Sequence, residues 1–100
     1  MQVFVTRFDL RIPGCRSLKQ KRTVVKGLTG ALRSRFQLSV AEVDHHDLWQ
    51  RSAIAVAIVG AEGHHLRRML HEARTLVEAW GEVELIDAEV YEVGLEDPVA

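Results

Sequence analysis

The sequence is short of the residues on which much of protein chemistry depends. Its 100 residues include one cysteine, Cys15, and no asparagine. A single thiol excludes an internal disulfide and the CxxC pairs that hold metals or exchange electrons. No apolar run approaches the roughly 18 residues of a membrane-spanning helix, and the first residues mix Arg7 and Asp9 into an alternating pattern. We therefore expect one cytoplasmic domain with neither a signal peptide nor a membrane contact.

Charge is unevenly distributed along the chain. Residues 1–36 contain nine lysines and arginines and one acid, which gives a net charge of +8. Residues 37–100 contain four arginines and thirteen acids, which gives −9. This asymmetry indicates an anionic partner for the basic part, unless the two parts neutralise each other in the folded domain.

The N-terminal third predicts a strand followed by a helix. Phe4, Phe8, Leu10 and Ile12 are apolar at even positions while charged residues occupy odd ones, which is the two-residue period of a half-buried strand over 3–12. Ser17, with Gln20 three residues later, has the spacing of a capping box, so a helix is expected to begin at Leu18. One side of this helix is apolar and the other is basic.

Two glycines interrupt the interior of that helix. Gly27 and Gly30 are unfavourable there, by roughly 1 kcal/mol each relative to alanine. We expect close packing against a neighbouring element at both positions.

The rest of the chain predicts two strands, a helix and a last strand. The strands are expected at 38–43, 49–59 and 83–93, with a polar turn at 44–47 and a helix from Leu66 that ends at Gly81. Strand 49–59 is apolar on both faces, which is typical of a central strand.

This order of elements predicts an α+β domain of the ferredoxin-like class, with the order βαββαβ. Its four-stranded antiparallel sheet would carry both helices on one face, with the first and third strands as the central pair. Residues 1–93 would form the domain and residues 94–100 a frayed tail. The 13–17 loop, the start of the first helix and the 44–48 turn would meet at one end of the sheet.

Several segments resemble a known family pattern. They are Ile12-Pro13-Gly14, Ser17-Leu18-Lys19, Lys21-Arg22 and, above all, Ser39-Val40-Ala41-Glu42-Val43-Asp44-His45 followed by Asp47-Leu48-Trp49-Gln50-Arg51. Over residues 1–93 the chain resembles the small bacterial YlxP-like family, a domain of unknown function. The resemblance implies a ferredoxin-like fold. Because members are often encoded beside translation factors, it also implies, by association, a role near the ribosome or RNA.

The resemblance implies no activity, cofactor or catalytic residue. It places six hairpin residues in the family motif without a role: Asp44, His45, Asp47, Trp49, Gln50 and Arg51. Cys15 and His46 depart from the family pattern.

An anion-binding site is predicted at the start of the first helix. Backbone N–H groups near Gly14, the helix dipole and basic side chains converge there, as phosphate recognition requires. The candidate contacts are Arg16, Lys19, Lys21, Arg22, Lys26 and Arg33. These cations also oppose the helix dipole and can pair with Asp44 or Asp47, so a solvated or ion-paired face is the alternative.

The sequence lacks the residues that other known activities of this fold require. An RNA-recognition domain stacks bases on aromatic residues of its central strands, but strand 49–59 offers only Trp49. Acylphosphatase-like hydrolysis needs an asparagine, and metallochaperones need a cysteine pair. The turn 44–47 contains aspartate and histidine, which are residue types that bind metal ions. Adjacent turn residues, however, usually point apart. We predict no metal, cofactor or catalytic residue; an enzyme that uses this turn with Cys15 would lack a recognisable base–nucleophile spacing.

We therefore expect a non-enzymatic binding domain that acts near RNA or the ribosome through its basic helix. The alternative is a homo-oligomerising or small-ligand-sensing module. Because strand 49–59 is apolar on both faces, a second copy could cover the helix-free face or extend an edge of the sheet.

Overall fold

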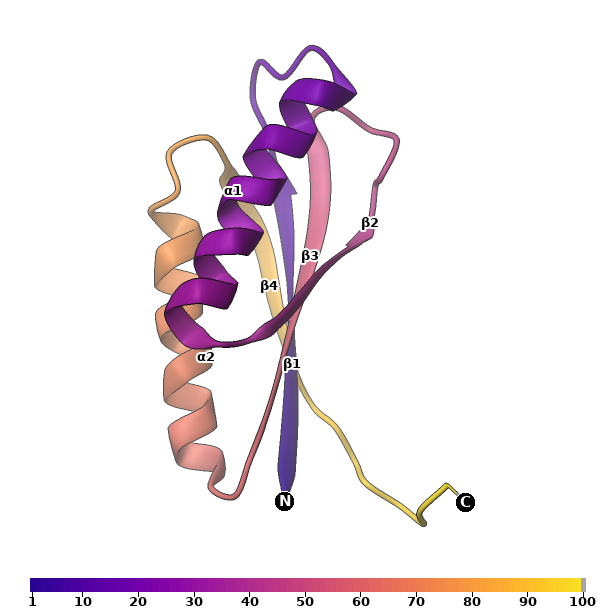
Figure 1. Ribbon diagram of the computed structural model, residues 1–100, viewed down its shortest axis with the longest axis vertical. Coiled ribbons are helices and arrows are strands. Elements are labelled where there is room, and N and C mark those ends of the chain that lie inside the picture. Colours follow the sequence, from indigo (N-terminus) through magenta and orange to yellow (C-terminus); the bar gives the residue numbers. More distant parts are fainter. Residues whose placement is uncertain (100) are drawn as a thin grey trace.

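The computed structural model describes residues 1–99, so Ala100, the last residue of the predicted tail, lies outside the described residues. Two helices and four strands alternate along the chain (Figure 1). They are β1 (Gln2–Arg11), α1 (Leu18–Phe36), β2 (Ser39–Asp44), β3 (Arg51–Gly60), α2 (Gly63–Glu78) and β4 (Glu84–Glu92). The predicted order of elements is confirmed.

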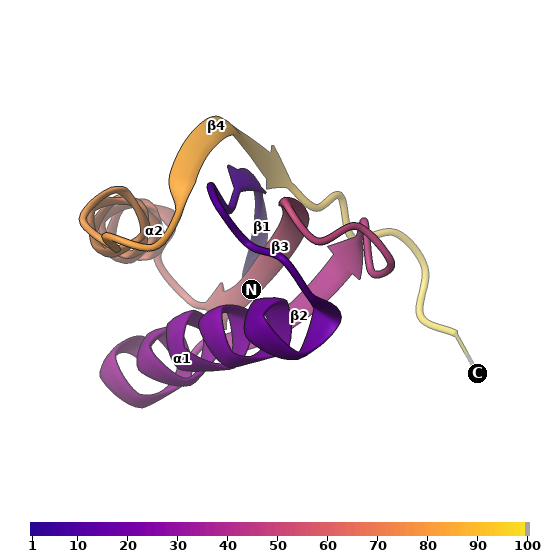
Figure 2. The ribbon, with the colours of Figure 1, turned by 90° about the horizontal axis from the view of Figure 1, so that it is seen from above.

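The four strands form one sheet in the order β2-β3-β1-β4, and every neighbouring pair is antiparallel. The central pair is therefore β1 and β3, as the sequence predicts. Both helices lie on the same side of the sheet, which leaves its other face open (Figure 2). The architecture is the expected α+β ferredoxin-like fold.

The strand period sets which side chains form the core. Phe4, Phe8 and Leu10 of β1 point toward the helices and are buried, while the odd-numbered residues of β1 lie on the open face. Phe8 pairs with Ile54 of β3, which is also buried. The helices complete this core with Val24, Leu28 and Leu32 of α1 and Leu66, Leu70, Ala73 and Val77 of α2.

The start of α1 follows the predicted capping box in part. The Ser17 hydroxyl accepts a hydrogen bond from the Gln20 backbone N–H at 3.1 Å. The Gln20 side chain in turn accepts from the Arg16 N–H at 2.8 Å, one residue before the usual partner. The first contact satisfies a backbone donor that a helix start leaves free.

The two glycines of α1 have different surroundings. A Cβ at Gly27 would lie 3.5 Å from Trp80, so this part of α1 packs closely against the end of α2. A Cβ at Gly30 would have no heavy atom within 4 Å, and the expectation of close packing there is wrong.

Several local details also differ from the prediction. The pairing of β2 with β3 shifts between Glu42 and Asp44, and Val43, at this bulge, is 45% exposed. Helix α2 ends at Glu78 rather than at Gly81, and the chain then turns so that Val83 N–H donates to the Trp80 carbonyl. Within residues 1–99, neither helix has the length and hydrophobicity needed to cross a bilayer.

Candidate functional site

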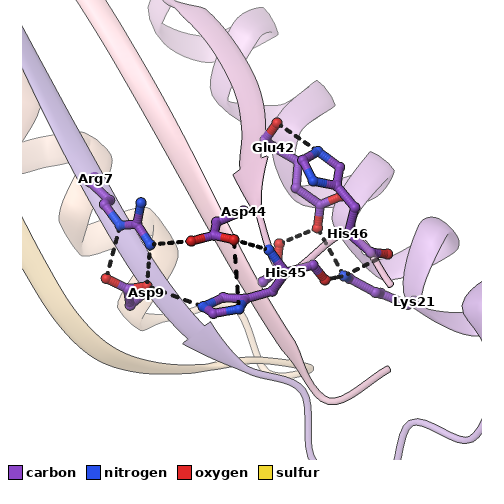
Figure 3. Close-up of polar contacts among 8 residues, drawn as sticks. Arg7, Asp9, Lys21, Glu42, Asp44, His45 and His46 are labelled. Carbon is purple, nitrogen blue, oxygen red and sulfur yellow. Dashed lines mark hydrogen bonds and ion pairs between the residues drawn. The ribbon is translucent and has the colours of Figure 1, made fainter. Parts of the chain in front are cut away.

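One cation of α1, Lys21, faces into the molecule. Its side chain is 2% exposed, and its ammonium lies 3.1 Å from a carboxylate oxygen of Glu42 on β2. The same ammonium donates to the backbone carbonyls of His45 and His46 in the β2–β3 turn (Figure 3). Ser52 of β3 completes the cluster, because its hydroxyl donates to Glu42 at 2.5 Å.

This cluster corrects the prediction for Lys21. Its charge is neutralised by Glu42, and two carbonyls take up further donors, so no ammonium surface is left for an anion. Lys21 instead ties the β2–β3 turn to the first turn of α1. Its role is to fix the position of the hairpin relative to the helix.

The other cations near the start of α1 point outward. Arg16, Lys19, Arg22 and Lys26 are exposed, and within residues 1–99 none of them has a carboxylate within ion-pair distance. We call these four residues the basic face of α1. Arg33, the remaining predicted contact, donates to the Val40 carbonyl at 2.8 Å and so bridges α1 to β2.

A groove runs between α1 and the β2–β3 hairpin beside this basic face. Its volume is about 490 Å³. Helix α1 lines one side of the groove, and β2 with the turn after it lines the other: Leu18, Lys21, Arg22, Val25, Lys26, Thr29 and Arg33; Glu42, His46 and Asp47. We call it the basic groove. Glu42 is already paired with Lys21, so Asp47 is the one carboxylate of this lining outside the ion pairs of residues 1–99.

A second polar network lies on the open face of the sheet, at the same end. Arg7 donates to Asp9 through two nitrogens, each at 3.2 Å, and to Asp44 at 3.3 Å. The His45 ring points toward both carboxylates, with nitrogens 4.0 Å from Asp9 and 3.9 Å from Asp44 (Figure 3). Here the Arg7 charge has two carboxylate partners, in contrast to the basic face of α1.

The network shifts two ionisations. Hydrogen bonds to Asp9 and then Asp44 raise the pKa of Arg7 above its ordinary value. The pKa of Asp44 is lowered, first by the His45 backbone N–H that donates to it at 2.7 Å and then by Arg7. His45 itself has a left-handed backbone, with φ of 60°.

The remaining motif residues join two loops at this end of the sheet. The Gln50 side chain donates to the Cys15 carbonyl at 3.3 Å, and the Ile12 N–H donates to the Gln50 carbonyl at 2.9 Å. Trp49 is 50% exposed beside them. The Arg51 Nε is buried and has no hydrogen-bond partner within residues 1–99. The expected meeting of the 13–17 loop and the hairpin turn is thus confirmed.

The potential metal ligands of the turn do not gather. The His46 ring contacts the Glu42 carbonyl on one side of the hairpin, whereas His45 lies with Asp9 on the other (Figure 3). Sequence reasoning missed a different group: Asp9, Asp87 and Glu89 have carboxylate oxygens within 4.8 Å of one another on the open face. Strand register brings them together, because Asp9 pairs directly with Asp87.

Comparisons with known proteins agree on the family and the fold. A family model described as "Protein of unknown function (DUF503)" matches residues 3–90. The chain is 28% identical over 68 residues to the uncharacterised protein YlxP of Bacillus subtilis (strain 168). The aligned region covers 68% of this chain and 74% of YlxP. The de novo designed protein Foldit4 superposes with a TM-score of 0.57 at 9% identity, covers 96% of this chain and 100% of its own, and shows the fold alone. The chain therefore belongs to the DUF503 family of YlxP-like proteins.

Proposed function

We propose that this domain is a non-enzymatic RNA-binding module that contacts phosphates through the basic face of α1. The observation that carries the proposal is that Arg16, Lys19, Arg22 and Lys26 are exposed and lack carboxylate partners within residues 1–99. Lysines and arginines that lie close together on one surface repel one another, and a bound polyanion compensates this repulsion. The polyanion also releases its counterions on binding, which favours the complex.

The spacing of these residues suits an extended anion. Lys19, Arg22 and Lys26 lie three and four residues apart, so they form one row along the helix. The row covers about 10.5 Å of helix axis at 1.5 Å per residue. Phosphates recur about every 3.4 Å along the axis of a nucleic-acid strand, so separate side chains can reach separate phosphates.

Trp49 favours single-stranded RNA over a duplex. Its indole is half exposed, and its neighbour Gln50 is hydrogen-bonded to Cys15, directly before Arg16. An exposed aromatic ring next to cations can stack on an unpaired base, which a duplex does not offer. Trp49→Ala is expected to weaken binding, and Trp49→Phe, which keeps an aromatic ring, to restore most of it.

The main test is the affinity for a fluorescent single-stranded oligoribonucleotide, measured by anisotropy over a series of salt concentrations. For K19Q/R22Q/K26Q, the slope of log affinity against log salt should become shallower by about 2, because each lost phosphate contact removes about 0.7. The matched control is R11Q/R35Q/R68Q, which removes the same total charge from scattered exposed positions. Equal losses in both variants would show that net charge alone drives binding and would contradict the proposal.

Self-association through the open face is a second candidate function. Val3, Val5, Val59 and Tyr91 form an apolar half of that face, away from the Arg7 network. Val59 is 63% exposed and Tyr91 48%. Pairing through the β4 edge is less favourable, because four acids of β4 would approach their copies: Glu84, Asp87, Glu89 and Glu92.

Sedimentation velocity at rising protein concentration tests this second candidate. A dimer should form in the micromolar range, and Val59→Asp should weaken it by placing a charge in the interface. The control is Ile86→Asp, an exposed apolar residue of β4 outside this patch. A strict monomer at all concentrations would contradict the candidate.

A further inference from the structure

A separate pocket lies on the other side of the molecule, between α2 and β4. Its volume is about 280 Å³, slightly below the lower end of the usual range for ligand pockets of roughly 300–1,000 Å³. Its walls are Arg67, Leu70, His71 and Arg74 of α2, Ala88 and Val90 of β4, and Thr6 of β1. We call it the α2–β4 pocket. It shares no residue with the basic groove.

The pocket contains a hydroxyl group with no visible use in the fold. Thr6 is 2% exposed, and its Oγ1 is buried without a hydrogen-bond partner within residues 1–99. Burying a hydroxyl in this way is unfavourable. Valine has nearly the same shape and would avoid the penalty, and Thr6 faces the core between Phe4 and Phe8. A ligand that bonds to this hydroxyl would account for threonine here.

The α2 wall of the pocket is cationic. Arg67, His71 and Arg74 follow one another at intervals of four and three residues, so all three lie along one side of the helix. Among residues 1–99, no acidic side chain lines the pocket. Arg67 lies 3.8 Å from Glu92, and Arg74 lies 3.1 Å from Glu78, but all four side chains are at least half exposed. Exposed ion pairs of this kind are weak, so an anion can compete for both guanidinium groups.

The opposite wall is apolar and leaves space. Ala88 and Val90 face the helix layer from β4, and Ala88 is small at a position where a larger residue would fill the gap. Leu70 closes the inner end and is itself buried. The Arg67 guanidinium is 5.2 Å from the centre of the Phe4 ring, a cation–π contact that holds its stem beside the pocket.

We propose that the α2–β4 pocket binds a small organic carboxylate. Arg67 and Arg74 would hold the carboxylate, since guanidinium groups match its planar geometry. The apolar body of the ligand would lie against Leu70, Ala88 and Val90, and the Thr6 hydroxyl would donate a hydrogen bond to one oxygen of the same carboxylate. The proposal is independent of RNA binding, because the two surfaces are on different helices and share no residue.

Benzoate is a suitable probe because it combines a carboxylate with a small apolar ring, and benzamide is its uncharged counterpart. Titration of the ¹⁵N-labelled full chain should give saturable NMR shifts in the millimolar range, centred on the amides of Thr6, His71, Ala88 and Val90. Benzamide should bind at least about tenfold more weakly, because it lacks the charge for the two arginines. Shifts that fail to saturate, or that spread evenly over the surface, would overturn the proposal.

Three variants separate binding from folding. R67Q/R74Q should weaken benzoate binding at least about tenfold, whereas R68Q, an exposed neighbour that does not line the pocket, should leave it unchanged. Thr6→Val should raise the melting temperature, since it removes an unpaired hydroxyl, and at the same time weaken benzoate binding. A Thr6→Val variant that binds benzoate as tightly as the wild type would overturn the role of the hydroxyl, and unchanged binding in R67Q/R74Q would overturn the site.

Discussion

The basic face of α1 and the open face of the sheet differ in whether their cations have carboxylate partners. On the open face Arg7 contacts Asp9 and Asp44, and Arg11 lies 3.6 Å from Glu84. On α1 the inward-facing Lys21 has its partner in Glu42, while the four outward cations have none within residues 1–99. The charge asymmetry of the sequence is therefore cancelled locally on the sheet and remains uncancelled on the helix. A surface with uncompensated charge is the better candidate for binding an external anion.

The largest expected effect distinguishes two lysines of the same helix. Lys21→Met leaves the Glu42 carboxylate and two turn carbonyls without their cation, so the free energy of unfolding should fall by about 3 kcal/mol. Lys19→Met is the matched control: it makes the same change on the exposed side, and its effect should stay within about 0.5 kcal/mol. Urea denaturation measures both. Similar losses in the free energy of unfolding for the two variants would contradict the conclusion that Lys21 is structural and Lys19 is free.

A smaller effect concerns the paired charges of the open face at low pH. The pKa of Asp44 in the folded state lies below its usual 3.8. Its ionised form therefore stabilises the fold above about pH 4, and this contribution is lost as pH falls through the lowered pKa. Asp44→Asn should make the loss of stability between about pH 5 and about pH 2 less steep. A wild-type slope that is unchanged in the variant would show that the network does not matter for folding.

The smallest expected effect is a change in one ionisation. Tyr91 donates a hydrogen bond to Glu89 at 2.5 Å, and this bond raises the pKa of Tyr91 above its usual 10.0. Because the neutral phenol is favoured in the fold, its contribution is present below about pH 10 and lost as pH rises through the raised pKa. Glu89→Gln should move the midpoint of the ultraviolet titration of Tyr91 back toward 10. An unchanged midpoint would contradict the contact.

The fold could be predicted from the sequence because its signals are local and periodic. The alternation of β1, the Ser17 cap and the two amphipathic helices needed no knowledge of long-range contacts, and they determined the order of elements. The burial of Lys21 had a signal that was not used. Lys21 lies three residues after Leu18 and four before Val25, which places it in the apolar row of the helix.

Other features depend on contacts that no short segment contains. The partner of Lys21 lies on β2, 21 residues away along the chain, and becomes apparent only when the hairpin is placed against α1. The bulge at Val43 depends on the pairing of β2 with β3. The α2–β4 pocket arises because small or short side chains of β4 face α2 across a gap, and this spacing cannot be read from the hydrophobic pattern.

NMR mapping of an unlabelled single-stranded oligoribonucleotide on the ¹⁵N-labelled protein tests the central claim most directly. We expect shifts at Arg16–Lys26 and at the 45–50 turn, which fade as salt is raised, with little change at Arg7, Asp9 or Glu89 on the open face. Shifts centred on the open face, or an absence of shifts at low salt, would contradict the claim that the uncompensated cations of α1 form the binding surface.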